Sequence, residues 1–422
     1  MAVLADSGHD VVGVDRRTDL VEALNEGRTP HFEPGLAELL EKVRDRVRAT
    51  TDTTAAVAET DATFVIVPTP TGPDGTFVLD YVLPAMEEIG AGMAKGSGSK
   101  NGHLVVLTST VMPGATGGAV RRALEESSGL QAGKDFGLCY NPEFVALGAV
   151  IQGLRGPDFL LIGEDEEAPV HGDRLVEIYE GVCPGRPAAR MAFANAELAK
   201  LAVNTFVTTK ISFANLLAQL CSRLPGGNVD QVTDALGLDA RIGKKYLRGA
   251  LGYGGPCFPR DNLALVELAH SLGADPQLPQ ATDAFNRGLV GELVRMVEER
   301  LPANGTTAVL GLSYKPDTDV SEESQGLALV EALIQQGHAV RAYDPAARPE
   351  LPAAAERSAD LQGAVDGADV VVITTPWPEF GGLRQELPTG AGPITIIDGW
   401  RMLDPNDFEG IAEVQAPGRG RR

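Results

Sequence analysis

The sequence has few cysteines and no long apolar run, and each shortage excludes a class of protein. Its 422 residues include four cysteines and no Cys-x-x-Cys pair, which argues against a disulfide-rich fold and a zinc site. We therefore expect no metal site. No apolar stretch approaches the roughly 18 residues of a membrane span, and no basic segment followed by an apolar run opens the chain. Neither a membrane span nor a signal peptide is predicted.

Basic residues are also scarce, because 36 lysines and arginines stand against 58 aspartates and glutamates, a formal net charge of −22. Such a charge repels phosphate backbones and anionic lipid, so we expect no nucleic-acid partner and no membrane partner. A phosphate-bearing ligand would need a local site of cations or backbone N–H groups. The composition is that of an ordinary globular protein, and the length predicts roughly two to three domains. Because neither a membrane span nor a signal peptide is predicted, we expect a cytoplasmic enzyme.

Short β-branched runs alternate with helical stretches in the first part of the chain and again in the last part. This alternation predicts parallel sheets covered by helices. The expected strands are residues 9–15, 62–67, 104–107, 307–312, 339–344, 368–374 and 395–398. Loops at the carboxyl ends of such strands line the ligand crevice of an open α/β sheet. The loops of residues 68–72 and 108–114 are therefore candidate site loops.

Residues 192–224 form one continuous helical pattern without proline or glycine. A helix of about thirty residues spans roughly 45 Å, more than one small domain needs. We expect it to join two domains and to carry a homodimer contact. The predicted fold class is α/β, with two Rossmann-like doubly wound domains joined by this long central helix and a helical middle domain. The predicted boundaries are 1–190, 191–295 and 296–415, followed by a tail of residues 416–422 that we expect to be a solvated, disordered end.

The chain lacks the usual start of a dinucleotide-binding unit. Such a unit opens with a strand, a Gly-x-Gly-x-x-Gly loop at a helix N-terminus, and an acid about 20 residues on that binds ribose. Asp15 matches that acid, but only 14 residues precede it, and Met1–His9 fits the second half of the helix. The first strand and the glycine loop are therefore absent, which should leave a gap in the sheet. Two explanations stay open: a start codon assigned too far downstream, or a chain that has lost cofactor binding.

The most distinctive segment is Gly252–Asp261, with the sequence Gly-Tyr-Gly-Gly-Pro-Cys-Phe-Pro-Arg-Asp. Its glycines allow close approach of the backbone to a ligand, and its prolines fix the turn. Cys257 lies four residues before Asp261 and is placed for nucleophilic chemistry. A lone cysteine is more often a small buried hydrophobe. We keep that interpretation for the other three cysteines, Cys139, Cys183 and Cys221.

Several polar residues have both a chemical and a plainer interpretation. Lys200 and Asn204 are four residues apart, so on a helix they share one face, where they could hold an oxyanion and a water. The plainer interpretation of this pair is an exposed helix face. Glu143 follows a proline after a strand and could act as a base through water, or could simply favour a helix N-terminus. Thr110 could be an N-cap, and Arg241 could be a surface charge.

Taken in order, these segments resemble the UDP-glucose/GDP-mannose dehydrogenase family along essentially the whole chain. The family's Gly-Gly-x-Cys-Phe-Pro-Lys-Asp motif is similar to Gly254–Asp261, with Arg260 in place of lysine. The other matching segments are Ser109–Gly114, Asn141–Phe144, Ala196–Asn204, Arg241–Gly243, Gly311–Asp319 and Trp377–Phe380. Any one of these segments is weakly specific, whereas the ordered set is highly specific.

The resemblance implies NAD-dependent oxidation of the C6 alcohol of a nucleotide sugar to a carboxylate, with one covalent intermediate on a cysteine. It places NAD in the first domain and the nucleotide of the sugar in the last. The implied catalytic residues are Cys257, Lys200, Asn204, Glu143, Asp261 and Thr110. The implied NAD contacts are Asp15, Thr69, Pro70, Thr110 and Lys315. The implied substrate contacts are Glu143, Lys200, Asn204, Arg241, Tyr253, Gly254, Lys315 and Arg401.

The resemblance also implies what each catalytic group does. In the first oxidation a base takes the proton of the alcohol through a water held by Thr110, Glu143 and Lys200, while hydride leaves. The thiolate of the cysteine then adds to the aldehyde, and Lys200 and Asn204 stabilise the oxygen of the thiohemiacetal. After the second oxidation, water activated by Glu143, with Asp261 assisting, releases the uronate. Arg241 reaches across a dimer in the family.

Departures from the family pattern concern the substrate. A charged pair after Asn-Pro-Glu-Phe is Ala146 and Leu147 here, and two arginines of later motifs are Glu322 and Trp400, with Arg401 beside the latter. UDP-glucose is the expected substrate, and a UDP-N-acetylhexosamine or GDP-mannose dehydrogenase is the alternative within the enzyme class. A non-catalytic nucleotide-sugar-binding homologue is the alternative of another class, because the glycine loop is absent.

Overall fold

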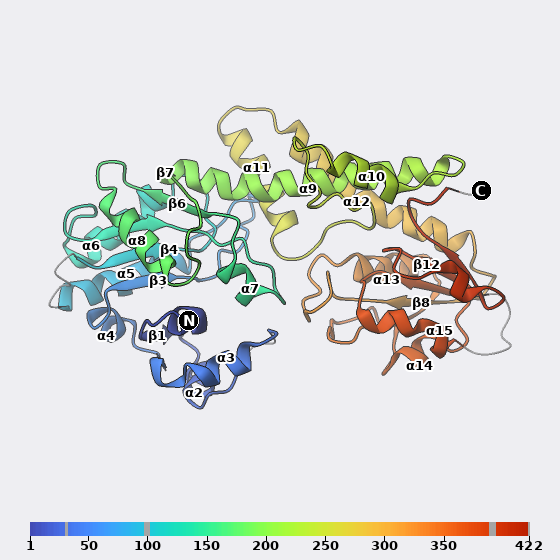
Figure 1. Ribbon diagram of the computed structural model, residues 1–422, viewed down its shortest axis with the longest axis horizontal. Coiled ribbons are helices and arrows are strands. Elements are labelled where there is room, and N and C mark those ends of the chain that lie inside the picture. The colour runs from blue at the N-terminus through green and yellow to red at the C-terminus, as the bar shows by residue number, and fades with distance from the viewer. Residues whose placement is uncertain (30–32, 97–101, 388–393, 421–422) are drawn as a thin grey trace. The chain divides into compact units, whose positions relative to one another are not determined.

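The structure is a computed structural model that describes residues 1–422 except 30–32, 97–101, 388–393 and 421–422 (Figure 1). It divides into two compact units, Met1–Ala202 and Val203–Arg422. Along the chain, a first set of strands is followed by helices and then by a second set of strands. The predicted division into three domains and a tail stays a prediction.

The first unit contains two sheets. A two-stranded parallel sheet pairs β1 (Val11–Val14) with β2 (Val47–Thr50). A five-stranded sheet has the order β3 (Ala62–Val65), β4 (Leu104–Leu107), β5 (Gly137–Tyr140), β6 (Leu160–Glu164) and β7 (Ala188–Ala192). All neighbours in it are parallel except β5 and β6, which are antiparallel. The all-parallel expectation was therefore wrong for this one pair.

The predicted gap is present in the first unit. Within the described residues, no strand pairs with the second edge of β1 or with that of β3, so the two sheets remain separate. Residues 2–6 form the short helix α1, as expected for the second half of a longer helix. The split agrees with the expectation that the central strand of the usual order is absent from this sequence.

Helices cover the sheets of the first unit, and burial alternates along the strands. On β4, Val105 and Leu107 belong to one buried apolar cluster, whereas Leu104 and Val106 belong to another. Successive side chains of a strand point to opposite faces, so both faces of this sheet are covered. The helices are α1 (Ala2–Asp6), α2 (Thr18–Asn25), α3 (Leu36–Lys42), α4 (Thr53–Ala58), α5 (Val82–Lys95), α6 (Arg121–Ser128), α7 (Val150–Arg155) and α8 (Val170–Glu180), with a 3-10 turn at Arg44–Arg46 and a π-helical turn at Thr116–Val120.

The predicted long helix is α9, Phe193–Arg223, with 31 residues. Its bounds differ by one residue at each end from the predicted 192–224. Proline and glycine are absent from it, so nothing interrupts its ladder of backbone hydrogen bonds. The division between the units falls inside this helix, after Ala202.

The second unit holds a six-stranded, fully parallel sheet with the order β10-β9-β8-β11-β12-β13. The strands are β8 (Thr306–Leu310), β9 (Ala339–Tyr343), β10 (Glu356–Arg357), β11 (Val370–Ile373), β12 (Ile394–Asp398) and β13 (Ala412–Gln415). This is the doubly wound order, in which the strands are added on one side of β8 up to β10 and then on its other side from β11 on. The helices are α10 (Val229–Gly237), α11 (Phe258–Ser271), α12 (Gln277–Glu298), α13 (Gln325–Gln335), α14 (Leu361–Val365) and α15 (Leu383–Glu386), with 3-10 turns at Pro378–Gly382 and Pro405–Phe408.

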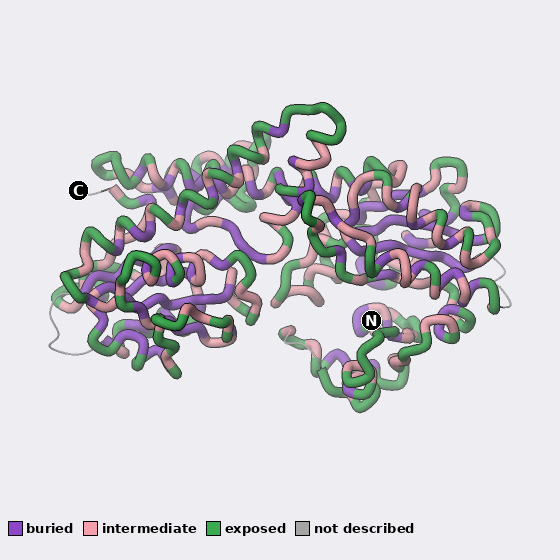
Figure 2. Tube along the Cα trace, turned by 180° about the vertical axis from the view of Figure 1, so that it is seen from behind, coloured by how far each residue is buried: buried purple, intermediate pink, exposed green. Residues whose placement is uncertain are grey.

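Strand β11 shows why this sheet forms. Its four residues are β-branched and buried, with Val371 and Ile373 in one apolar cluster and Val370 and Val372 in another. A strand buried on both faces reads as a continuous apolar run. Strands β4, β5, β6, β11 and β12 are buried along their whole length, and Figure 2 shows long buried stretches of the trace in the interior of each unit. The α/β fold class predicted from the sequence is confirmed.

The end of the chain does not behave as predicted. The Val229 amide donates to the carbonyl of Gly418 at 2.9 Å, and the Gly418 amide donates to Ser222 Oγ at 2.8 Å. The guanidinium of Arg419 lies 2.7 Å from an oxygen of Asp230. The expectation of a solvated end is wrong for these residues, because their polar groups are paired with α9 and α10. Arg421 and Arg422 lie outside the described residues.

No helix in the described part of the chain combines the length and the apolar character needed to cross a bilayer.

Candidate active site

Cys257 lies at the N-terminus of helix α11, in the second unit. It is exposed, whereas Cys139, Cys183 and Cys221 are buried, as their interpretation as small hydrophobes predicted. Burial raises the pKa of the Cys139 thiol to about 12. A helix N-terminus favours a negative charge, so the position of Cys257 stabilises its thiolate, which is the nucleophilic form.

Asp261 and Asn204 form a buried pair beside the cysteine loop. The Nδ2 of Asn204 donates to Oδ2 of Asp261 at 2.6 Å, and these residues are 9% and 1% exposed. The Asp261 amide donates to the carbonyl of Cys257 at 2.8 Å, which places both residues in the first turn of α11. Arg260 adds a cation, its Nε 3.6 Å from Oδ1 of Asp261. The structure therefore brings three of the predicted catalytic residues together within the second unit.

The two glycines before Cys257 are in close contact with the loop that follows β8. A Cβ on Gly254 would lie 2.1 Å from the carbonyl oxygen of Glu323, and one on Gly255 would lie 2.6 Å from the ring of Tyr314. Gly255 also has φ +82°, and its amide donates to the carbonyl of Glu322 at 2.9 Å. Burial, with the thiol of Cys257 nearby, raises the pKa of Tyr314 to about 12. The glycines thus allow the cysteine loop to pack against this loop.

We expect Gly254→Ala to destabilise the second unit by about 1–3 kcal/mol, because the new methyl group would meet a backbone oxygen that cannot rotate away. Urea unfolding measures the change. The matched control is Gly291→Ala on α12, where an added Cβ meets nothing within 4 Å. That control should be neutral or slightly stabilising. Equal effects of the two substitutions would contradict the packing described here.

Lys200 and Glu143 are in contact in the first unit. Lys200 is 6% exposed, and its Nζ donates to the backbone carbonyl of Glu143 at 2.7 Å. The same ammonium lies 4.6 Å from the ring centroid of Phe144. The interpretation of Lys200 and Asn204 as an exposed helix face is therefore wrong. The Glu143 side chain is exposed and accepts from the amide of Val145 at 2.6 Å, well before the start of α7, so it does not serve a helix N-terminus.

Sequence analysis missed the structural role of Glu197. This fully buried residue accepts hydrogen bonds from the amides of Gly114, at 2.5 Å, and Thr116, at 2.7 Å. It thereby fixes the loop that carries Thr110, which is not a helix N-cap here. The only available signal was its place beside Ala196 in the matching helix segment. The neighbouring Ser109 joins the two candidate loops, because its Oγ accepts from the amide of Val67 and donates to its carbonyl.

Burial raises the pKa of Glu197 above its usual value of 4.5, even though two backbone amides donate to it. The folded form then holds the proton more tightly than the unfolded chain, so the contribution of this group to stability is complete below pH 4.5. This contribution to stability is lost as the pH rises through the raised pKa of Glu197. We expect the thermal midpoint of the protein to fall relative to that of Glu197→Gln as the pH rises from 4 to 7. Exposed Glu126→Gln is the control and should show no such trend; a parallel trend in both variants would contradict the assignment.

Four of the five predicted NAD contacts lie at the carboxyl ends of strands in the first unit, and the fifth, Lys315, lies in the second unit. Asp15 follows β1 and is exposed, and its Oδ1 accepts from the amide of Arg17 at 2.8 Å. Thr69 is buried and Pro70 exposed in the loop after β3, and Thr110 lies in the loop after β4. Dinucleotides bind at this edge of an open parallel sheet, so the assignment of these residues to the ribose end stays a prediction. Residues 1–14 contain no counterpart of the glycine loop that binds the phosphates.

The cations predicted to bind the nucleotide of the sugar differ in their exposure and in the side chains they contact. Lys315 lies in the loop after β8, beside the point where the strand order reverses, and its Nζ is 5.7 Å from the ring centroid of Tyr314. Arg241 is highly exposed and paired with Asp239, as a surface charge would be. Arg401 is almost fully buried, and its guanidinium is paired with Asp230 at 2.8 Å. It could bind a nucleotide only by leaving that carboxylate.

Trp400 occupies the position where the family motif has an arginine. Its ring is covered by the guanidinium of Arg248, whose carbon lies 5.7 Å from the ring centroid, and the same guanidinium donates to the Trp400 carbonyl. The indole Nε1 donates to the carbonyl of Thr374 at 2.9 Å. A cation is therefore present beside the substituted position, although it comes from a different part of the second unit.

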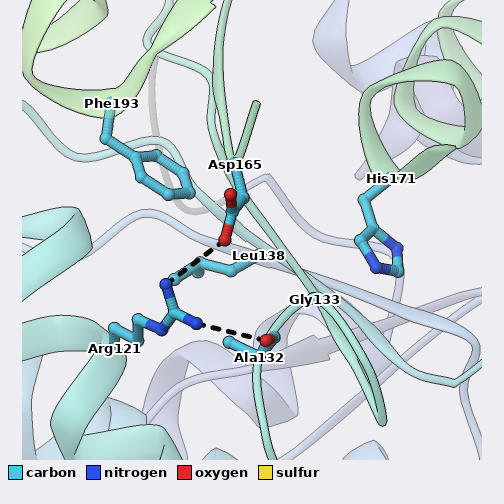
Figure 3. A pocket seen from close by; sticks show the side chains of 7 residues that line it. All are labelled: Arg121, Ala132, Gly133, Leu138, Asp165, His171 and Phe193. Carbon is cyan, nitrogen blue, oxygen red and sulfur yellow. Dashed lines mark hydrogen bonds and ion pairs between the residues drawn. The ribbon is translucent and has the colours of Figure 1, made fainter. Parts of the chain in front are cut away.

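A small cavity in the first unit lies apart from these groups (Figure 3). It is lined by Arg121, Ala132, Gly133, Leu138, Asp165, His171 and Phe193, none of which is a predicted site residue. The guanidinium of Arg121 bridges Asp165 and the carbonyl of Ala132 across it. These contacts hold α6 against the neighbouring loops, and we assign the cavity a structural role.

Comparison with known proteins shows which family the chain belongs to. Three domains of the UDP-glucose/GDP-mannose dehydrogenase family match it: the NAD binding domain over residues 1–183, the central domain over 194–288 and the UDP binding domain over 308–405. The chain belongs to the UDP-glucose/GDP-mannose dehydrogenase family. The resemblance and the NAD cofactor predicted from the sequence are confirmed, and the protein is a nucleotide-sugar dehydrogenase of this family.

Similar proteins cover nearly the whole chain. UDP-glucose 6-dehydrogenase AglM of Haloferax volcanii is 37% identical over 413 residues, which are 95% of this chain and 94% of that protein. GDP-mannose 6-dehydrogenase of Azotobacter vinelandii is 32% identical, over 97% of this chain and 95% of that protein. The structure of a UDP-glucose dehydrogenase from Pyrobaculum islandicum has a TM-score of 0.88 and 35% identity, covering 99% of this chain and 94% of that one.

Proposed function

We propose that this protein oxidises the C6 alcohol of UDP-glucose to the carboxylate of UDP-glucuronate, through a covalent intermediate on Cys257. The observation that carries the proposal is the exposed thiol at the N-terminus of α11, one helical turn from the buried pair of Asp261 and Asn204. A thiolate there is stabilised by the helix dipole and can attack an aldehyde. UDP-glucose is favoured because relatives with 35–37% identity are named for that substrate.

Each catalytic residue has its own role in this proposal. NAD, when bound, supplies a hydride acceptor for both oxidations. We assign Glu143 to proton removal through a water, with Thr110 and Lys200 holding that water. Lys200 and Asn204 lie one turn apart on α9, where a cation and an amide stabilise the oxyanion of a thiohemiacetal on the cysteine. Asp261 then assists Glu143 in activating the water that releases the acid.

Steady-state assays of NADH formation test the proposal. We expect two NADH per UDP-glucose consumed, and at least tenfold higher kcat/KM for UDP-glucose than for a UDP-N-acetylhexosamine or GDP-mannose. Preference for either of the other two sugars would transfer the proposal to that substrate. Absence of NADH with all of them would contradict dehydrogenase activity.

Calorimetric titration with NAD separates an enzyme from a non-catalytic binding homologue. A dissociation constant between micromolar and millimolar corresponds to roughly −8 to −4 kcal/mol and would support an enzyme. We expect binding in that range. A sugar nucleotide that binds while NAD does not would support the non-catalytic alternative.

We also propose that the protein is a homodimer, with α9 at the contact. Large apolar side chains of α9 are exposed at helical spacing, among them Phe206, Phe213, Leu216 and Leu220. Such a stripe is costly to leave in water, and a second copy of the same helix has the matching surface. Arg241, which the family resemblance places across a dimer, is exposed as that role requires.

Sedimentation tests the dimer. At about 10 μM we expect the mass of two chains, and we expect Phe213→Asp to give the mass of one, because a buried carboxylate without a partner is strongly unfavourable. Leu278→Asp is the control, since Leu278 is exposed at the start of α12 rather than on α9. A single-chain mass for the unsubstituted protein would contradict this proposal.

A further inference from the structure

Two buried asparagines hold the main chain just before the cysteine loop. Asn215 of α9 accepts from the amide of Ala250 at 2.8 Å and donates to the carbonyl of Leu251 at 2.9 Å. Asn286 of α12 does the same for one residue, accepting from the amide of Tyr253 at 2.9 Å and donating to its carbonyl at 3.0 Å. Each side-chain amide therefore pairs with the backbone as a neighbouring strand would.

A third asparagine holds the same tyrosine from the other end. Asn262 is the fifth residue of α11, and its Nδ2 donates to the hydroxyl of Tyr253 at 2.7 Å. Its own Oδ1 accepts from Thr208 Oγ1 of α9 at 3.0 Å. The ring of Tyr253 meets that of Phe258 edge to face, with centroids 6.1 Å apart. Tyr253 is thus fixed at its backbone by α12 and at its hydroxyl by the helix that begins after Cys257.

The segment between Tyr253 and Cys257 is fixed by contacts from outside it, with Asn286 at Tyr253 and the carbonyl of Glu322 at the Gly255 amide. Gly252, Gly254 and Gly255 have no side chains to pack, and glycine has the largest conformational freedom in the unfolded chain. Gly252 also sits against Asn286, since a Cβ there would lie 2.6 Å from its Oδ1. Three residues separate Tyr253 from Cys257. Asn286 therefore fixes one end of the short, glycine-rich segment that leads to the thiol at the N-terminus of α11.

We propose that Asn286 is a positioning residue that holds Cys257 at the N-terminus of α11 by pairing with both backbone groups of Tyr253. The role of the thiol as nucleophile rests on the proposed function. The placement of the thiol rests only on the contacts that Asn286 makes with Tyr253. Asn286 touches none of the reacting atoms in this assignment. Its effect is to keep the thiol where the helix dipole stabilises the thiolate.

The test is the pH dependence of alkylation of Cys257 by iodoacetamide, read by mass spectrometry of the peptide that contains it. The other three cysteines are buried, so labelling of the folded protein reports this thiol. We expect Asn286→Ala to raise the midpoint pH of labelling by about 0.5, because a loosened loop lets the thiol move away from the N-terminus of α11. The labelling rate at pH 7 then falls about threefold.

Thr282→Val is the matched control, because Thr282 is buried on α12 one turn before Asn286 and its hydroxyl contacts Thr209 instead of the cysteine loop. We expect it to keep the midpoint and the rate of the unsubstituted protein. Equal midpoints for Asn286→Ala and Thr282→Val would overturn the proposal, whether both midpoints are shifted or both are unchanged.

Asn286→Asp keeps the proposal testable if the alanine variant does not fold. Aspartate retains the acceptor for the Tyr253 amide but, when ionised, cannot donate to its carbonyl. We expect a shift in the same direction, and an unchanged midpoint would contradict the proposal. Alkylation requires neither NAD nor a sugar nucleotide, so failure of this inference is distinguishable from failure of the proposed function, which the NADH assay measures.

Discussion

Cys257→Ser is expected to lower uronate formation by about three orders of magnitude or more, because a serine hydroxyl is a far weaker nucleophile than a thiolate. The rest of the site is retained, since Asp261, Asn204 and Lys200 make their contacts without the sulfur. Binding of UDP-glucose should therefore stay within a few-fold of the unsubstituted protein. Product analysis gives the rate, and calorimetry gives the affinity.

The control for this substitution is Cys221→Ala, which removes a buried thiol from the apolar cluster of Ala218 and Val229. We expect that variant to lose some stability and to keep its activity. Full turnover of Cys257→Ser to the uronate would refute the nucleophile assignment. Loss of sugar-nucleotide binding in the same variant would instead show that the thiol supports the fold of the loop.

Lys200→Met is expected to lower kcat by about 10²–10³-fold, which is the usual cost of removing one donor to a developing oxyanion. Methionine approximates the length of the lysine stem and removes the ammonium, so the contact with Phe144 is partly kept. The backbone carbonyl of Glu143 loses its donor at the same time. We therefore expect a moderate loss of stability beside the loss of rate.

Lys134→Met provides the control, because Lys134 is exposed and its Nζ lies 3.5 Å from Gln131 on the surface of the first unit. It should leave kcat unchanged. Rapid-quench kinetics with the aldehyde form of the substrate locates the defect, which we expect in the step that forms the thiohemiacetal. A kcat for Lys200→Met within threefold of the unsubstituted value would rule out a role for the ammonium in charge stabilisation.

Sequence patterns predicted those strands whose signals are local, namely β1, β3, β4, β8, β9, β11 and β12, and missed β2, β5, β6, β7, β10 and β13. Val105, Leu107, Val371 and Ile373 belong to short β-branched or apolar runs whose alternation fixes two buried faces. The absence of proline and glycine predicted α9 to within one residue at each end. The predicted gap in the first sheet followed from the strand order of a dinucleotide-binding unit, and not from any one residue.

The candidate site was predicted in its residue types and only partly in its contacts. Cys257 is exposed at a helix N-terminus, and the pairing of Asn204 with Asp261 supports the grouping made from spacing and family motifs. The positions of Glu197 and Asn286 as supports of the loops were not foreseen. Glutamate and asparagine on a helix give no sequence signal that says which distant backbone amide they contact.

The contacts that sequence analysis missed join residues far apart in the chain. Arg401 was predicted to bind the nucleotide, yet it is paired with Asp230, 171 positions earlier. Arg419 in the tail is paired with the same carboxylate. Composition alone suggested a solvated tail, because three arginines at a chain end are usually hydrated. Only the folded structure shows that Asp230 is available to them.

The most direct test of the account is rapid acid quenching of the protein with UDP-glucose and NAD, followed by mass spectrometry of the peptide that contains Cys257. The account predicts a transient mass increase on this peptide, equal to the oxidised sugar nucleotide, and no such increase in Cys257→Ser. Turnover without an adduct on this peptide at any time point, or an adduct on another residue, would contradict it.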